Sequence, residues 1–235
     1  MQSWSIIIFC YNEVNTISQM IDKCYATIQN MGVNDYEIIV VDDGSSDGSK
    51  SKIIKQQVTY PDLIVKFHAK NLGIGHALRT GYATAKNENI CAVPADGQFD
   101  LDELIPFSEI IGNTIISFYR KENTTYNFFR NSLSKANKQI NLWLNGFELK
   151  DVNWVKIYKN EGIQKMSLEI ESSLIESEIC AKFLLMKYEV KEVESKYLQR
   201  NFGVSKGSSL KIISQAMRDT LYLWQVLRRF KNRLN

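Results

Sequence analysis

The sequence predicts an α/β protein with a mainly parallel, doubly wound β-sheet, and two observations predict it. In the first half of the chain, short apolar and β-branched runs alternate with segments whose apolar residues recur at helical spacing. The chain has 235 residues, 44% hydrophobic and 23% charged, which is enough for one large domain of ordinary globular composition. Repeated strand–helix units of this kind place ligands at the carboxyl ends of the parallel strands.

Four strands with helices between them are expected in order along the first half. The strands are expected at 5–10, 36–41, 63–67 and 90–93. The second is a nearly continuous apolar run, which is typical of a strand buried on both faces, and Pro94 stops the fourth. The helices are expected from Asn15 as N-cap to Ile28, from the turn rich in Gly, Ser and Asp to Lys55, and from Gly73 to Ala85.

The second half is less regular. Strands are expected at 115–119 and 187–193, and a helix at 127–144. A final helix is expected from about Ser208, with an apolar stripe made of Ile213, Met217, Leu221, Trp224 and Leu227. No repeat or Pro/Gly linker interrupts the chain. We therefore expect one domain over residues 1–207, followed by a basic amphipathic helix over 208–235.

Composition and charge restrict the function classes. No stretch approaches the roughly 18 apolar residues of a membrane span, and the first residues lack the basic region of a signal peptide. The net charge of +3 is too small to indicate a nucleic-acid partner. The cysteines are far apart and show no CxxC spacing, so reduced, buried thiols of a cytoplasmic protein are expected at Cys10, Cys24, Cys91 and Cys180.

Acidic side chains follow three of the predicted strands. Glu13 comes after the first strand, Asp42 and Asp43 end the second, and Asp96 follows the fourth. Because the carboxyl ends of parallel strands open on one edge, these carboxylates should converge in one crevice. Carboxylates in one crevice repel each other unless a positive or hydrogen-bonding partner lies among them. A metal ion, or the donor groups of a nucleotide base and ribose, would satisfy that requirement.

Other polar residues have simpler interpretations. Capping of the next helix is the preferred one for Asp47 and Ser49. The glycine segment 71–77 lacks the third glycine of a dinucleotide loop, so its glycines are expected to let a helix start pack tightly. Cations that suit a diphosphate occur in the second half, although any one of them alone reads as a solvated surface residue. They are Arg120, Arg130, Arg200 and Lys206.

Read in order, six segments resemble the family-2 glycosyltransferases of GT-A fold, and within them the polyprenyl-phosphate (dolichol-phosphate mannose synthase-like) branch. The resemblance covers roughly residues 3 to 210. The segments are Ile6–Glu13, Glu37–Asp47, Asn71–Gly81, Ala95–Gln98, the Arg130, Ser134 and Asn137 pattern followed by Asp151, and Arg200–Lys206.

The resemblance implies transfer of a sugar from a UDP- or GDP-linked donor to an acceptor, with a polyprenyl phosphate favoured. It implies nucleotide-sugar contacts from Phe9, Tyr11, Glu13, Asp42, Asp43, Ala95 and Asp96. It implies that Asp96 and Gln98 hold Mg²⁺ or Mn²⁺, and that phosphates are bound by Arg120, Arg130, Ser134, Arg200 and Lys206. Asp96 and Asp151 are the implied catalytic residues, because Asp151 would take the proton of a hydroxyl acceptor. In-line attack would invert the anomeric centre.

Two departures from the family pattern keep alternatives open. Pro94 stands where the metal motif usually has a first Asp, and Phe9 with Cys10 stand where Pro-Thr is common. The alternatives are transfer to a glycan hydroxyl in cell-surface polysaccharide synthesis and a silenced nucleotide-sugar binding protein. A nucleotidyltransferase is disfavoured because Tyr11–Glu13 is acidic where a basic, glycine-rich loop is expected. A nicotinamide-dependent dehydrogenase would need the missing glycine fingerprint.

The basic C-terminal helix has two interpretations. Its four basic residues in the last eight, with no acid, suit an anionic membrane surface. In that case the protein would be cytoplasmic and peripheral on the inner face of the membrane. Alternatively, the apolar stripe packs on the core or on another subunit.

Overall fold

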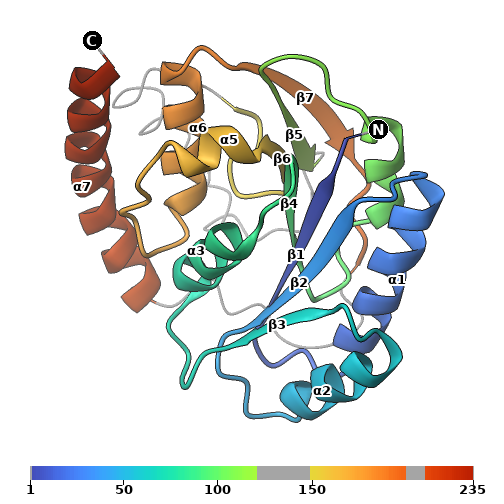
Figure 1. The fold of residues 1–235 in the computed structure, drawn as a ribbon. Helices are drawn as coiled ribbons and strands as arrows, with labels where there is room; N and C mark the ends of the chain where they lie inside the picture. Colours follow the sequence, from blue (N-terminus) through green and yellow to red (C-terminus); the bar gives the residue numbers. More distant parts are fainter. Residues whose placement is uncertain (1, 121–148, 200–209, 235) are drawn as a thin grey trace.

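A seven-stranded β-sheet forms the centre of the structure, with strand order β3-β2-β1-β4-β6-β5-β7 (Figure 1). The computed structural model describes residues 2–120, 149–199 and 210–234. Neighbouring strands pair in parallel except at β6, which runs antiparallel to both β4 and β5. This confirms the mainly parallel α/β sheet. The strands are β1 (Trp4–Cys10), β2 (Tyr36–Asp42), β3 (Ile64–Phe67), β4 (Asn89–Pro94), β5 (Thr114–Arg120), β6 (Lys156–Lys159) and β7 (Glu189–Ser195).

Helices cover both faces of the sheet (Figure 1). One layer holds α1 (Ile17–Asn30), α2 (Ser49–Thr59) and the 3₁₀ helix η1 (Leu101–Phe107). The other holds α3 (Ile74–Thr84), α5 (Asn160–Gln164), α6 (Ile175–Leu185) and α7 (Leu210–Leu234). Alternate residues of β1 enter the two apolar cores: Ile6 and Ile8 pack on the α1 side, and Ile7 on the α3 side. The central strands are therefore buried on both faces, as their apolar residues require.

The predicted N-cap of the first helix is wrong. Thr16, not Asn15, occupies the N-cap of α1, and no side chain caps the helix there. The carbonyl oxygen of Glu13 accepts the backbone N–H groups of both Thr16 and Ile17, at 3.1 and 3.0 Å. The turn after β1 therefore closes one residue later than the sequence pattern indicates.

Four of the described elements were not predicted. They are η1, β6, α5 and α6, and β7 begins two residues later than the expected strand at 187–193. The helix expected at 127–144 lies outside the described residues. The helix expected from about Ser208 corresponds to α7, which begins at Leu210.

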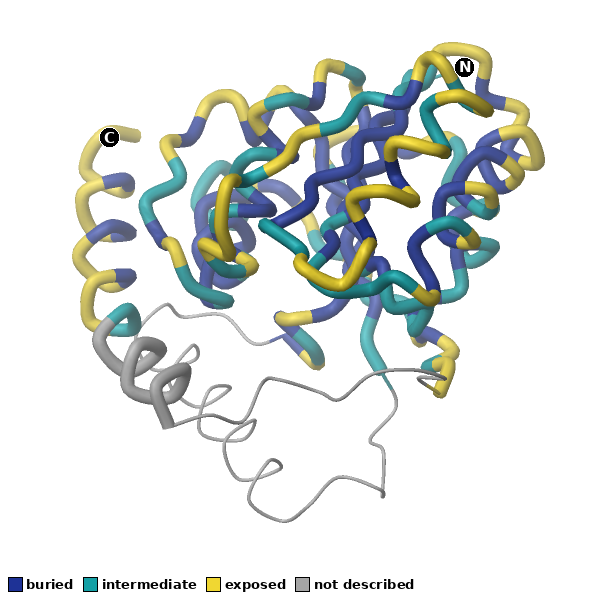
Figure 2. Tube along the Cα trace, turned by 90° about the horizontal axis from the view of Figure 1, so that it is seen from below, coloured by how far each residue is buried: buried dark blue, intermediate teal, exposed yellow. Residues whose placement is uncertain are grey.

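The described side chains of α7 correct the predicted apolar stripe. Leu223, Leu227 and Phe230 are buried in the same core as α6, whereas Leu221 and Trp224 are 68% and 41% exposed. Figure 2 shows the same division, with buried positions on the inner side of α7 and exposed ones outside. The helix carries two overlapping apolar sets, and packing against α6 selects the one centred on Leu223 and Phe230. The other two stripe members, Ile213 and Met217, have side chains outside the described part.

Candidate active site

The carboxyl ends of β1, β2 and β4 lie side by side, so the acidic segments meet at one edge as predicted. In the parallel register, Cys10 pairs with Asp42 and Phe9 pairs with Pro94. Two backbone hydrogen bonds continue this register beyond the strands. The N–H of Asp43 donates to the carbonyl of Cys10 at 2.8 Å, and the N–H of Ala95 donates to that of Phe9 at 3.1 Å.

The loops after β1 and β2 form one hydrogen-bonded unit. The central residue is Asn12, whose φ of 56° is unusual for a residue other than glycine. Its N–H donates to the Ser45 hydroxyl, and its side-chain oxygen accepts the N–H of Ser46, both at 2.8 Å. Asp42, which is buried, accepts the N–H of Ser45 at 3.2 Å and the hydroxyl of the same residue. Asn12 had no predicted role, although it lies between Tyr11 and Glu13 in the segment that resembles the family.

The capping interpretation of Asp47 and Ser49 needs correction, because Gly48 is the N-cap of α2, no side chain caps it, and Ser49 is the first helical residue. Asp47 instead binds the start of the helix from the position before the N-cap. Its carboxylate accepts the N–H of Ser49, the first residue of α2, at 3.0 Å, and the Ser49 hydroxyl at 2.6 Å. It also accepts the N–H of Val14 at 3.0 Å. Burial alone would raise the pKa of Asp47, but the hydrogen bonds from Ser49 and Val14 outweigh burial and lower it. The formal N-cap is Gly48, whose φ of 96° suits glycine.

Asp43 anchors the segment that leads into α3. Its side chain is almost fully buried, and its carboxylate accepts the N–H groups of Leu72 and Gly73 at 3.0 and 2.8 Å. The Nδ1 atom of His68 lies 2.7 Å from the same carboxylate, and the Nε2 atom lies 2.9 Å from the Thr80 hydroxyl. Asp43 therefore holds the start of α3 at the site edge, and its contact with a nucleotide stays a prediction.

The turn after β4 carries the predicted metal ligands. Asp96 accepts the N–H of Gln98 at 3.0 Å, with Gly97 at a φ of 73° between them. The Gln98 side-chain amide donates to the Tyr197 hydroxyl, and the Gln98 carbonyl accepts the N–H of Leu198 at 3.1 Å. Within the described residues, no group of three or more His, Cys, Asp or Glu side chains could hold a metal ion. Any ion here would need further ligands from its substrate or from water.

Arg120, at the end of β5, forms a two-point ion pair with Asp151. Its Nε lies 2.7 Å from Oδ2 and its Nη2 lies 3.2 Å from Oδ1. Both side chains are largely buried, at 23% and 14% exposure, so water screens the pair less than it would a surface pair. The guanidinium carbon lies 4.5 Å from the centre of the Trp154 ring and 5.8 Å from that of Tyr197.

Trp154 and Tyr197 are site residues that sequence reasoning missed. The two rings lie 5.8 Å apart, and together they connect Arg120 with Gln98. The indole Nε1 of Trp154 donates to the Ser195 hydroxyl at 3.0 Å, which fixes the ring on the end of β7. One available signal was Trp154 itself, a large aromatic residue three positions after Asp151.

The cysteines are buried as free thiols. At Cys10, burial first and the negative charge of Asp42 second raise the pKa to about 12. The thiol therefore stays protonated at neutral pH and is a weak nucleophile. Cys10 contributes to this edge as a small packing residue.

Four predicted phosphate-binding residues lie outside the described residues. They are Arg130, Ser134, Arg200 and Lys206. The described edge thus contains Phe9, Tyr11, Glu13, Asp42, Asp43, Ala95, Asp96, Gln98, Arg120 and Asp151.

Residues 5–170 match the model for glycosyl transferase family 2. The chain belongs to this family. As a family-2 glycosyl transferase it also resembles curated proteins along much of its length. It is 25% identical over 215 residues to the undecaprenyl-phosphate 4-deoxy-4-formamido-L-arabinose transferase of Edwardsiella ictaluri, a match that covers 89% of this chain and 64% of the relative. It is 25% identical over 123 residues to a dolichyl-phosphate beta-glucosyltransferase of Trichomonas vaginalis, covering 51% and 37%. The chain thus spans less than two thirds of both relatives.

Solved structures show that this family-2 glycosyl transferase has the GT-A fold. The mannosyltransferase PcManGT of Pyrobaculum calidifontis, in complex with GDP-Man and Mn²⁺, superposes with a TM-score of 0.58 at 15% identity. That match covers 97% of this chain and 73% of the other. The glucosyl-3-phosphoglycerate synthase of Mycobacterium tuberculosis superposes with a TM-score of 0.61 at 16% identity, covering 92% and 80%. At these identities the likeness establishes the fold alone.

Proposed function

We propose that this family-2 glycosyl transferase is an inverting enzyme that moves a sugar from a UDP- or GDP-linked donor to a polyprenyl phosphate. Two curated relatives carry a polyprenyl phosphate acceptor in their names. Two of the structural neighbours are complexes with a nucleotide-sugar, one with GDP-Man and one with uridine-diphosphate-glucose. Within the chain itself, the observation that carries the choice of acceptor is the Arg120–Asp151 ion pair.

The ion pair favours an acceptor that is already ionised. A hydroxyl acceptor needs a base, and Asp151 is the candidate for it. Accepting a proton, however, would cost Asp151 its two-point pairing with Arg120. A phosphate monoester is an anion at neutral pH and can attack without losing a proton to the protein. In this mechanism Asp151 orients the Arg120 guanidinium, and the guanidinium stabilises negative charge that gathers between donor and acceptor.

A divalent ion fits the turn after β4. Asp96 offers a carboxylate, and Gln98 offers an amide oxygen because its amide nitrogen is engaged with Tyr197. Oxygen ligands of this kind suit Mg²⁺ and Mn²⁺, and Mg²⁺ is commonly held by one or two carboxylates together with substrate phosphates. Pro94 supplies no ligand atom, so the donor diphosphate and water would complete the shell. When bound, the ion would stabilise charge on the departing nucleoside diphosphate.

The nucleotide is proposed to lie over the joined loops after β1 and β2. Phe9, Tyr11 and Glu13 are only partly buried at this edge, so they remain accessible to a ligand. Asp42 and Asp43 are buried, and their carboxylates accept backbone N–H groups of the neighbouring loops. Ala95 is a small buried residue next to Asp96, where a larger side chain would narrow the space.

Replacing Asp151 by Asn tests the acceptor class. Because Asn can still hydrogen-bond Arg120, we expect kcat with a polyprenyl phosphate to fall less than about tenfold. The fall of kcat/KM at low pH (the acidic limb of the pH profile) should remain in the variant. The measurement is nucleoside diphosphate release over pH 5 to 9, with polyprenyl phosphate and with glycan hydroxyl acceptors compared. A loss above about a hundredfold together with loss of the acidic limb would identify Asp151 as a general base and favour the glycan acceptor.

We also propose that the outer face of α7 contacts an anionic membrane surface. This face exposes Leu221, Tyr222 and Trp224, with the Arg228 guanidinium 5.5 Å from the Trp224 ring. The inner face already packs on α6. Packing on the core therefore describes the inner side of the helix, and the proposed membrane contact concerns its outer side. Exposed apolar and aromatic residues next to basic side chains are typical of interfacial helices. Among the described residues, no helix combines the length and apolar character that a bilayer crossing requires.

Flotation with liposomes tests the membrane contact. The double variant Leu221→Gln/Trp224→Gln removes the exposed apolar groups, and we expect binding to anionic vesicles to fall about tenfold. The matched control is Ile54→Gln/Val58→Gln, an exposed apolar pair on α2 in the opposite layer, which should leave binding unchanged. Equal binding by wild type and the α7 variant, or no preference for anionic over neutral vesicles, would contradict the proposal.

A further inference from the structure

A buried lysine lies directly behind the turn that carries Asp151. Lys156 begins β6, and its side chain has no exposed surface. Its Nζ donates to the carbonyl oxygens of Val152 at 2.5 Å and Trp154 at 2.9 Å. A lysine ammonium has three donors and no acceptor, so two of its three hydrogens are committed to this one turn.

The third side of the ammonium faces a carboxylate from α6. Glu176 Oε2 lies 3.5 Å from Lys156 Nζ. The same carboxylate accepts the hydroxyls of Tyr82 from α3, at 2.9 Å, and of Tyr158 from β6, at 2.7 Å. Lys156 therefore has a charge partner and acceptors on every side, which is what allows a lysine to remain buried. Packing alone would be served by an apolar residue of similar length, so the ammonium points to a more specific role.

The two carbonyl groups belong to the segment that orients the Arg120–Asp151 pair. Asp151 immediately precedes Val152, and its Oδ1 accepts the N–H of Asn153 at 3.2 Å. The ring of Trp154 stacks under the Arg120 guanidinium. A shift of either carbonyl would therefore move the carboxylate or the aromatic surface on which the guanidinium rests.

We propose that Lys156 is a positioning residue, which fixes the Arg120–Asp151 pair by binding the carbonyl oxygens of Val152 and Trp154. Glu176 compensates the positive charge of the buried ammonium. The importance of this for transfer rests on the proposed function, but the geometric effect does not. Lys156 contacts no substrate in this scheme. Its effect reaches the site through the 151–154 turn.

The test uses the double variant Lys156→Met/Glu176→Gln, which removes the ammonium without leaving a buried, unpaired carboxylate. The matched control is Tyr82→Phe, which removes one hydrogen bond from the same Glu176 cluster but does not touch the turn. Hydrogen exchange of the Arg120 Nε–H, assigned by NMR with Arg120→Lys, reports the ion pair without any assay of activity. Thermal unfolding of each variant shows that it is folded and how much stability it has lost.

We expect exchange of the Arg120 Nε–H to accelerate about tenfold or more in the double variant and to stay unchanged in Tyr82→Phe. In the transfer assay, kcat should fall while KM for the donor changes little, and Tyr82→Phe should keep both values. Unchanged Nε–H exchange in a folded double variant would overturn the proposal. If the wild type transfers sugar to no polyprenyl phosphate, the proposed function fails, and the exchange result still decides the role of Lys156.

Discussion

Replacing Asp96 by Ala is expected to lower kcat/KM for sugar transfer by about a thousandfold or more, and to make donor binding independent of Mn²⁺. The reason is the small number of protein ligands in the metal site proposed at the turn after β4. Pro94 removes one oxygen ligand that the family pattern usually has, so Asp96 is the one carboxylate left in the motif. Loss of that carboxylate leaves the amide oxygen of Gln98, and a single neutral ligand does not hold a divalent ion firmly.

The measurement is nucleoside diphosphate release from UDP-, GDP- and dTDP-sugars with a polyprenyl phosphate present, with Mn²⁺ or after EDTA. EDTA should reduce the wild-type rate to that of Asp96→Ala. The control is Asp102→Ala on η1. This change removes a half-exposed ion pair between Asp102 and Lys23 of α1, and it should leave transfer unaffected. Donor binding by the wild type without release from any donor would instead show that Pro94 marks a silenced, nucleotide-sugar binding protein.

The first half of the fold could be predicted because its central strands are mostly apolar. Residues 38–41 and 90–93 are buried on both faces of the sheet, and a short continuous apolar run of this kind predicts a buried strand. The register of parallel strands then brings Asp42 and Asp96 to one edge from sequence position alone. The common edge of the strand ends was therefore predictable, and the structure confirms it; that the carboxylates meet in one crevice stays a prediction.

Two of the missed elements, β6 and α6, contain buried ionisable residues. β6 includes Lys156 and Lys159, and α6 includes Glu178 and Lys182, all of which are buried. Glu178 and Lys182 pair with each other at 2.5 Å, one helical turn apart. A pattern of apolar spacing counts such residues as surface positions. Their partners are set by tertiary contacts, which local sequence does not contain.

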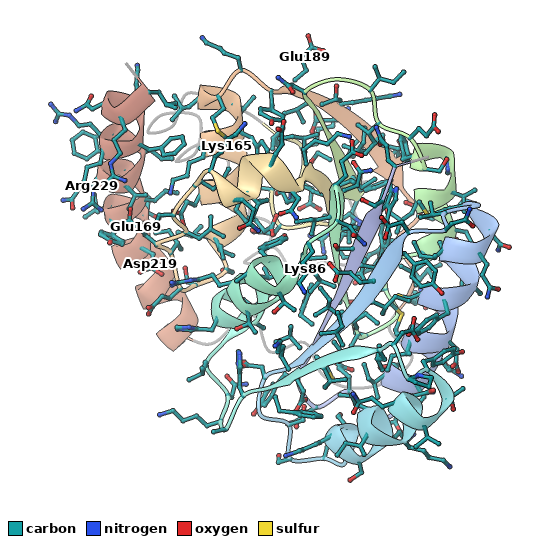
Figure 3. The ribbon with its side chains drawn as sticks, in the orientation of Figure 1. Lys86, Lys165, Glu169, Glu189, Asp219 and Arg229 are labelled. Carbon is teal, nitrogen blue, oxygen red and sulfur yellow. The ribbon has the colours of Figure 1, made fainter. Side chains whose placement is uncertain are left out.

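The dependence on tertiary contacts also explains the errors at the site and in α7. Trp154 and Tyr197 belong to no motif, and only the fold brings them to Arg120. In α7, Arg229 pairs with Glu169 at 2.7 Å, and Tyr222 donates to the same carboxylate at 2.9 Å. Figure 3 shows Arg229 and Glu169 close together at this junction. These contacts fix the rotation of the helix, and with it the outward position of Trp224.

Replacing Gly75 by Ala is expected to destabilise the protein, although the position lies inside α3. Helix propensity alone predicts a gain of about 1 kcal/mol for this change. A Cβ at this position would lie 2.1 Å from the carbonyl oxygen of Glu171 and 2.7 Å from that of Ser172. These are backbone atoms of the segment before α6, so they cannot move aside as a side-chain tip can. The clash should reverse the sign, with a net loss of about 1–3 kcal/mol.

Thermal and urea unfolding measure the effect, with an expected fall in Tm of about 2–4 °C for each kcal/mol lost. The matched control is Ala83→Gly, at an exposed position of the same helix, which gives the propensity term without any clash. A rise in Tm for Gly75→Ala would mean that α3 does not pack as closely on residues 171–172 as the structure has it. Asp43 accepts the N–H of Gly73. Displacement of this helix start should therefore also shift Asp43, which lies at the edge where the nucleotide is proposed to bind. We therefore expect weaker donor binding in Gly75→Ala even at temperatures where the variant is fully folded, and no such change in Ala83→Gly.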